Sequence, residues 1–248
     1  MDNPKATGTP AAVMLASNIY TPSKLIKDML QRKLAADAAA RVKEAFSDEI
    51  YDTVILTGGA TLKKGEDYEL FAVPIGEQSK TATNDNAVYK VTRQHTSIRT
   101  ARRLESGRAF SVHGMYANVT IPGNADTADE ELGGAGDPTP GAGRGAVNLL
   151  LMLQHAVSFI FVSDDVEHER GKLRRFTSPH GISGFAGTSA INAVANNGFG
   201  RGFRLPFPRD IWGNRDFGVK MIVHEDVLIP ITTEIEFVLD GFTVRVVG

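Results

Sequence analysis

The sequence predicts a mainly β protein: a jelly-roll β-sandwich, built as a single roll with long loops and preceded by an N-terminal arm and one amphipathic helix. From Tyr51 onward, short strand-like runs are separated by clusters of Gly, Pro, Asn and Asp, which is typical of a sandwich or barrel. The number of these runs is close to the roughly eight strands of one jelly roll. Two stacked rolls would need about 16 strands and would leave almost no residues for the long loops.

Residues 1–20 are predicted to form a flexible arm, because Pro4, Gly8, Pro10 and many small residues interrupt any regular pattern. The arm contains one apolar segment at residues 13–15. Such an arm usually becomes ordered only on a partner, so we expect it to contact a neighbouring subunit, a genome or an internal membrane.

Residues 21–47 are predicted to form an amphipathic helix. Thr21 is the expected cap, Pro22 the first helical residue, and apolar residues follow at spacings of three and four as far as Phe46. Charged residues occupy the opposite face. The simpler interpretation is that the helix packs on its own domain, and the alternative is that it docks on a neighbouring subunit or a membrane surface.

Residues 48–248 are assigned to the sandwich domain. The predicted strands are residues 52–56, 68–75, 87–92, 109–121, 148–162, 173–176, 202–206, 217–224 and 233–247. Residues 148–162 also fit a buried helix, although the β-branched and aromatic residues 157–162 favour a strand in the second half. Gly241 is expected to form a bulge or a hairpin turn, and Ile235 and Phe237 should face the core with Glu234 and Glu236 outside.

Two stretches read as long loops. Residues 122–145 combine a cluster of acids with a glycine-rich run, and a loop of this length in a compact domain suggests an exposed, functional or disordered excursion. We expect it on an outer or contact surface. Residues 181–202, rich in Gly and Asn, separate the final strands from the middle of the chain.

The composition restricts the classes of function. The 248 residues include no cysteine, which removes disulfides, thiolate metal sites and a cysteine nucleophile. The net charge of −2 gives no global attraction to nucleic acid or to an anionic membrane. No apolar run is long enough to span a bilayer, and the start of the chain lacks the basic head of a signal peptide. These features favour synthesis in a cytoplasm.

The sequence predicts no catalytic, cofactor-binding or metal site, so we expect a protein that is not an enzyme and uses no cofactor or small-molecule substrate. The glycine run 141–145 does not match a nucleotide-binding template, and the surroundings of Ser183 lack the spacing of a nucleophile elbow. The acidic residues at 164–170 read as a solvated turn. The six histidines are scattered singly, without the spacing of metal ligands.

Arginines and the tryptophan are the remaining candidates for contacts. Basic residues cluster at 93–108, 170–175 and 201–215. The simpler interpretation is that these arginines decorate loops and form salt bridges between subunits, and phosphate contact is the alternative. Trp212, in a loop beside Asp210 and Asn214, could stack on a sugar or fill a subunit contact. A non-catalytic binding module for a glycan or a receptor is therefore the alternative function.

Several segments resemble the jelly-roll capsid proteins of tailless bacteriophages. Residues 68–76 (YELFAVPIG), 80–84 (KTATN) and 105–114 (ESGRAFSVHG) resemble the opening strands and loops of these proteins. Residues 203–208 (FRLPFP), 217–223 (FGVKMIV) and 236–245 (EFVLDGFTVR) are similar to their closing strands.

The resemblance implies a structural protein of a virus particle, a capsid subunit that self-assembles into an icosahedral shell. Its partners would be copies of itself, in a trimeric or larger capsomer, and other virion proteins. Its location would be the virion, after synthesis in the cytoplasm of a host. The resemblance carries over no catalytic residue.

Overall fold

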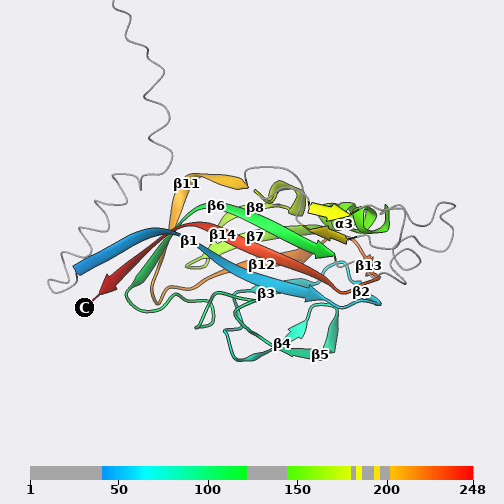
Figure 1. The fold of residues 1–248 in the computed structure, drawn as a ribbon, viewed down its shortest axis with the longest axis horizontal. Helices are drawn as coiled ribbons and strands as arrows, with labels where there is room; N and C mark the ends of the chain where they lie inside the picture. The colour runs from blue at the N-terminus through cyan, green and yellow to red at the C-terminus, as the bar shows by residue number, and fades with distance from the viewer. Residues whose placement is uncertain (1–40, 122–143, 180–182, 186–192, 196–201, 248) are drawn as a thin grey trace, which may run out of the picture. The chain divides into compact units, whose positions relative to one another are not determined.

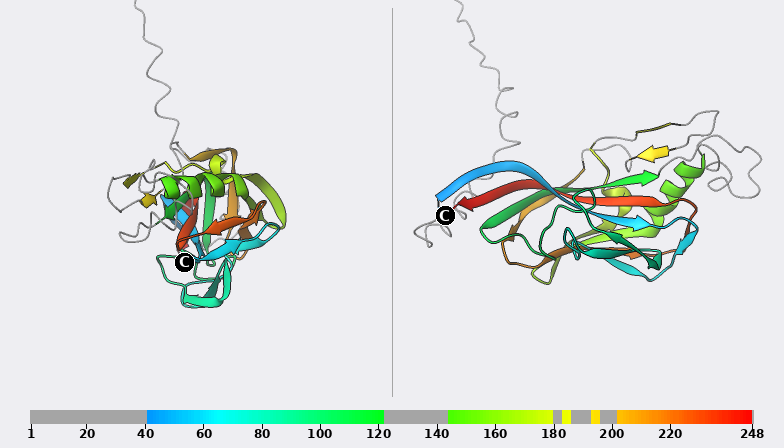
Figure 2. Two further views of the ribbon diagram at one scale, coloured as in Figure 1. Left: turned by 90° about the vertical axis from the view of Figure 1, so that its right-hand side faces the viewer. Right: turned by 60° about the horizontal axis from the view of Figure 1, so that its bottom comes forward.

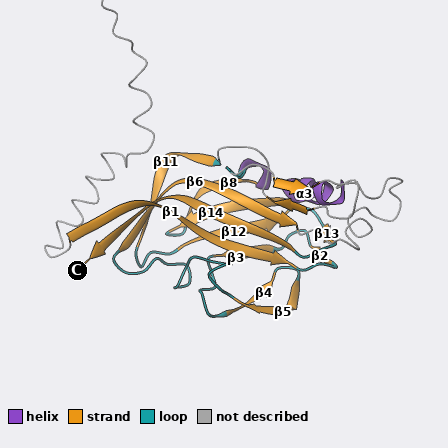
Figure 3. Ribbon diagram, viewed as in Figure 1, coloured by secondary structure: helices purple, strands orange, loops and turns teal. Residues whose placement is uncertain are grey.

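The computed structural model describes residues 41–121, 144–179, 183–185, 193–195 and 202–247 (Figure 1). Residues 43–246 cluster into one compact unit, and the fold below is that of this unit. Strands dominate the described residues, with α3 (Arg144–Ala156) and the short 3₁₀ helix η1 (Leu173–Arg175) as the helical elements (Figure 3). The predicted mainly β class is confirmed.

The larger sheet has six strands in the order β1-β14-β6-β10-β9, with β11 also pairing with β6. Its strands are β1 (Arg41–Leu56), β6 (Arg108–Ile121), β9 (Ser183–Phe185), β10 (Ala193–Ala195), β11 (Phe203–Trp212) and β14 (Thr233–Val247). β6 lies inside this sheet and pairs antiparallel with β14, β10 and β11.

The smaller sheet has four strands in the order β3-β12-β7-β8. Its strands are β3 (Asp67–Leu70), β7 (Val157–Ser163), β8 (Val166–Lys172) and β12 (Phe217–Val223), all paired antiparallel. Two short ribbons complete the unit: β2 (Ala60–Leu62) with β13 (Val227–Ile229), and β4 (Gln78–Thr81) with β5 (Asn84–Lys90).

The two sheets face each other across one hydrophobic core (Figure 2). The ring of Phe159 on β7 lies 4.7 Å from that of Phe237 on β14, and Phe176 packs edge-on against both rings. All three side chains are almost fully buried. Aromatic contacts of this kind, together with the aliphatic residues around them, hold the sheets together as a β-sandwich.

Eight of the strands pair as a nested set. β7 and β8 form the innermost pair and are joined by a two-residue turn, Asp164-Asp165, whose φ angles of 50° and 61° match the backbone of a type I′ hairpin. Outside this hairpin, β6 pairs with β11, β3 pairs with β12, and β1 pairs with β14. In chain order, the fourth strand of the set thus pairs with the fifth, the third with the sixth, the second with the seventh and the first with the eighth.

Gly241 forms the bulge that the sequence predicted for the last strand. The register between β14 and β6 shifts between Asp240 and Gly241, and a Cβ at Gly241 would lie 1.9 Å from the carbonyl oxygen of Ser111. The predicted alternation before it is also confirmed, since Ile235 and Phe237 are buried whereas Glu234 is exposed and Glu236 is half-buried.

The predicted helix at 21–47 is wrong in its last seven residues, because residues 41–47 belong to β1. The spacing of apolar residues there fits a helix, but hydrogen bonding to β14 along a long strand outweighs a local helical pattern. The predicted arm (1–20), the rest of that helix (21–40), nearly all of the long loop (122–143) and most of residues 181–202 lie outside the described residues.

The segment 148–162 divides between the two alternatives. α3 extends to Ala156, with Leu149, Leu150 and Leu153 buried and Leu151 exposed, so the helical period holds in the first half. β7 begins at Val157, so the strand expected in the second half is confirmed. Residues 173–176, predicted as a strand, contain η1 instead.

Other boundaries moved for local reasons. The strand predicted at 68–75 ends at Leu70, because Phe71 has a φ of 63°, which no strand residue adopts. β11 continues beyond the predicted 202–206 to Trp212, so this tryptophan ends a strand rather than lying in a loop. The solvated turn predicted for 164–170 holds only for Asp164 and Asp165, since β8 begins at Val166.

Candidate functional site

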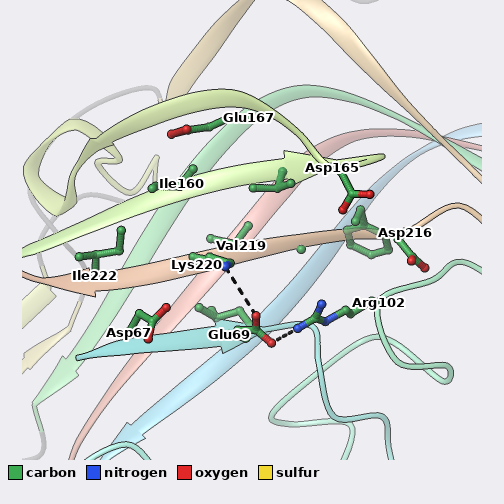
Figure 4. A pocket seen from close by; sticks show the side chains of 14 residues that line it. Asp67, Glu69, Arg102, Ile160, Asp165, Glu167, Asp216, Val219, Lys220 and Ile222 are labelled. Atoms are coloured by element: carbon green, nitrogen blue, oxygen red, sulfur yellow. Dashed lines mark ion pairs between the residues drawn. The ribbon is translucent and has the colours of Figure 1, made fainter. Parts of the chain in front are cut away.

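The outer face of the four-stranded sheet carries a hollow of about 520 Å³ (Figure 4). Its lining comes from β3, β12, β7 and β8 and from the neighbouring loop that carries Arg102. Four sequence segments that are far apart in the chain therefore build one surface. We call it the carboxylate-rimmed hollow, for the side chains described below.

Strand register places the apolar floor of the hollow. Gly218 on β12 pairs with Val162 on β7, and Lys220 pairs with Ile160, so these residues lie side by side on one face. Gly218 has no side chain, and a Cβ there would meet only the carbonyl oxygen of Leu70 at 3.5 Å. Together with Ile222, the two β7 side chains therefore line an open space rather than a filled one.

The rim of the hollow is acidic. Five carboxylates line it against two cations, Arg102 and Lys220 (Figure 4). These carboxylates are Asp67, Glu69, Asp165, Glu167 and Asp216.

Salt bridges neutralise part of this rim. Glu69 pairs with Arg102 and, at 3.8 Å, with the ammonium of Lys220. Cations from beside the hollow reach two other carboxylates: Arg170 pairs with Glu167 and Arg103 with Asp216, at 2.7 Å and 2.6 Å. The hydrogen bond from Arg103 is the main cause that lowers the pKa of Asp216.

Two rim carboxylates keep their charge uncompensated. Asp67 and Asp165 form no ion pair with any residue that the structure describes. Asp67 lies on β3 at one side of the hollow, and Asp165 lies at the β7–β8 turn (Figure 4). The rim is therefore negative overall, because the hollow holds more carboxylates than cations.

A buried carboxylate fixes the loop that carries Arg102. The backbone N–H of Phe71 donates to Asp52, and the carbonyl of Phe71 accepts from the N–H of Arg102 at 2.7 Å. Phe71 is fully buried and packs against Phe217, with ring centroids 5.4 Å apart. These contacts hold Phe71 in a left-handed conformation and aim Arg102 at Glu69.

Burial raises the pKa of Asp52 to about 7, despite the hydrogen bonds that it accepts from Phe71, Thr96 and Thr53. Asp52 lies on β1 beneath the loop, and does not line the carboxylate-rimmed hollow. It therefore contributes to the geometry of the rim rather than to its charge.

The hollow has the character of a binding surface. Its carboxylates surround aliphatic side chains rather than a nucleophile, and the hydrogen bond from Arg103 keeps the pKa of Asp216 below its usual value. An apolar floor with a negative rim favours a ligand that carries an apolar group beside positive charge.

A second surface feature projects from β11. Arg204 pairs with Gly114 of β6 and Arg209 pairs with Val112, so residues 205–208 bulge out of the ladder. Leu205 packs against the core, while Phe207 between two prolines is 73% exposed. An aromatic side chain held this far into solvent on a proline-flanked segment is a candidate contact residue.

Many arginines of the three basic clusters form salt bridges within the chain, and the salt bridges expected between subunits stay a prediction. The pairs beyond the hollow are Arg99–Glu105, Arg108–Asp48, Arg175–Glu169, Arg204–Asp240 and Arg215–Asp164. Arg209 is exposed and forms no ion pair with a described residue. Arg201 lies outside the described residues.

The other predicted features do not come together at a site. His168 bonds to Ser163 and His224 bonds to Ser158, each as a single pair. Within the residues that the structure describes, no group of histidine and acidic side chains could hold a metal ion. Ser183 lies in the short strand β9, and Trp212 is half-buried at the end of β11.

Sequence reasoning missed the hollow because its members are brought together only by long-range strand pairing. The local signal was the alternation of Asp67 and Glu69 with Tyr68 and Leu70, which marks an acidic outer face on β3. The exposed position of Phe207 had a weaker signal, the prolines on both of its sides.

Comparison with known proteins finds no family model and no curated protein that matches the chain. Among the described residues, no helix combines the length and the apolar character needed to cross a bilayer.

Proposed function

We propose that this protein is a self-assembling structural subunit with a single jelly-roll fold, and that copies of it form the shell of a virus particle. The nested pairing of eight strands is the observation that carries the proposal. A jelly roll is a two-sheet sandwich of about eight strands, and it is the fold of many viral capsid proteins as well as lectins and cupins.

The strand order supports the jelly-roll assignment. A long antiparallel ribbon, with β7 and β8 at its closed end and β1 and β14 at its open end, gives the observed pairs when it is rolled into two sheets. The rolled ribbon gives the sheet orders β1-β14-β6-β11 and β3-β12-β7-β8, which are the pairings that the two sheets contain.

Surface features favour assembly over an isolated role. A shell subunit needs a rigid body and contact surfaces that are not satisfied within the chain. The sandwich supplies the rigid body. Phe207 is 73% exposed and the rim of the hollow retains uncompensated carboxylates, so apolar and charged groups remain available for contacts.

Sedimentation velocity of the purified full chain across a range of concentrations tests the proposal. We expect discrete oligomers or large particles that become more abundant as the concentration rises, because assembly follows mass action. A protein that sediments as a monomer at every concentration and salt condition would contradict self-assembly.

A further inference from the structure

We infer that the Phe207 bulge of one copy docks into the carboxylate-rimmed hollow of a second copy, so that subunits join head to tail. The inference rests on the proposed self-assembly and specifies the contact through which it occurs. It joins an exposed aromatic side chain to a hollow whose rim carries two carboxylates without an ion-pair partner among the described residues.

The bulge is built as a preformed knob. Leu205 anchors it on the core, and Pro206 and Pro208 restrict the backbone on both sides of Phe207. Little conformational entropy would therefore be lost when the knob binds. Phe207 is 73% exposed, so its ring gains most of its burial in a complex.

The knob carries positive charge beside its aromatic ring. Arg209 is exposed and has no ion-pair partner among the described residues, and Arg204, bound to Asp240, is half-exposed on the other side. Burial, and after it the positive charge of Arg209, lowers the pKa of His168. The Arg209 guanidinium is therefore close to β8, the strand that carries His168. An arginine beside an aromatic anchor is a common composition of interface hot spots.

The hollow offers the complementary surface. Ile160 and Ile222 (Figure 4), together with Val162, form an apolar floor that can accept a ring. Gly218 leaves the space above it open. Asp67 and Asp165 on the rim have no ion-pair partner among the described residues, so the rim can accept the arginine of the knob. Attraction between these charges would orient the two copies as they meet.

The geometry of such a contact favours extended assembly. The knob is on β11 of the larger sheet, and the hollow is on the outer face of the smaller sheet. Because each copy presents both surfaces, a docked pair keeps one free knob and one free hollow, at which further copies can bind. Contacts of this heterologous kind close into rings or continue into larger assemblies.

Disulfide trapping tests the contact directly, since the chain has no cysteine of its own. One preparation carries Phe207→Cys and a second carries Ile222→Cys, and the two are mixed under mild oxidation. We expect a disulfide-linked dimer that contains one chain of each kind. The matched control replaces the Phe207 variant by Leu228→Cys, a residue on β13 that is 60% exposed and lies outside the hollow.

The inference predicts at least tenfold more linked dimer with the Phe207 pair than with the Leu228 control. Equal amounts in the two mixtures, in a protein that otherwise self-associates, would overturn the knob contact and leave the proposed self-assembly standing. A wild-type protein that remains a monomer at all concentrations would overturn both.

Charge reversal provides a second, independent readout. We expect Arg209→Glu to weaken self-association at least tenfold, and the combination of Asp67→Lys with Asp165→Asn on the rim to weaken it as well. A protein that carries all three changes should regain much of the wild-type association, because the knob and the rim again carry charges of opposite sign and attract each other. If Arg209→Glu associates like the wild type, or if the combination gives no recovery, the docking is wrong.

Discussion

Asp52 makes the stability of the fold depend on pH. Burial raises the pKa of this carboxyl from 3.8 to about 7. Between those values the folded protein keeps a proton that the unfolded chain releases, so its stability falls as the pH rises from about 4 to about 7.

We predict that Asp52→Asn removes this contribution. The free energy of unfolding of the wild type should fall relative to that of the variant by about 1–4 kcal/mol between pH 4 and pH 8, at about 1.4 kcal/mol per pKa unit. Urea denaturation at several pH values measures the difference. Asp67→Asn, which removes an exposed carboxylate, is the control. If the free energy of unfolding depends on pH in the same way in the wild type and in Asp52→Asn, Asp52 is not the source of this pH dependence.

His113 and His168 have the opposite effect on how stability changes with pH, so the contribution of Asp52 has to be measured as a difference between the wild type and Asp52→Asn. Burial is the main cause that lowers the pKa of His113 and of His168. A lowered histidine pKa makes the folded protein lose stability as the pH falls below about 6.5. Both histidines remain in Asp52→Asn, so their effect cancels in the difference.

At the scale of elements, the bulge at Gly241 depends on a close approach of two strands. A Cβ at Gly241 would lie 1.9 Å from the carbonyl oxygen of Ser111, which is backbone and cannot rotate away. We predict that Gly241→Ala lowers the free energy of unfolding by about 1–3 kcal/mol, as expected of overpacking.

Gly218→Ala is the matched control, because a Cβ there meets only the oxygen of Leu70 at an ordinary 3.5 Å. Its free energy of unfolding should change by less than about 0.5 kcal/mol. Chemical denaturation of both variants compares the two sites. Equal losses would show that the bulge does not require glycine.

Local sequence patterns correctly predicted the strands whose own residues carry the alternation of buried and exposed side chains. The alternation in the predicted strands 109–121, 217–224 and 233–247 identifies β6, β12 and β14, because each strand buries one side in the core. The charged β8 was read as a turn, since its partner β7 and not its own sequence makes it a strand. The end of the predicted helix became part of β1 for the same reason.

The carboxylate-rimmed hollow was beyond local prediction. Its floor and rim arise from the registers Gly218–Val162, Val162–Glu167 and Lys220–Glu69, which join strands from separate parts of the chain. The acidic and basic residues were visible in the sequence, but no local pattern shows which of them remain unpaired. Only the folded structure separates Asp67 from the carboxylates that bind arginine.

For the whole molecule, the proposal assigns assembly to surfaces outside the sandwich core. We predict that deletion of residues 1–20 impairs the formation of large assemblies and leaves the sandwich folded, because the deleted residues precede the unit formed by residues 43–246. Circular dichroism and thermal melting report on the fold, and sedimentation reports on assembly. A truncated protein that assembles like the full chain would refute this role for the arm.

The central claim is that copies of this chain form a shell. Electron microscopy of the purified full chain tests it most directly, because particles and their subunits are seen without any assumption about the contact. The account predicts closed particles or regular oligomers built from repeated sandwiches. If electron microscopy shows only separate monomers over a wide range of protein and salt concentrations, the claim that copies form a shell is wrong.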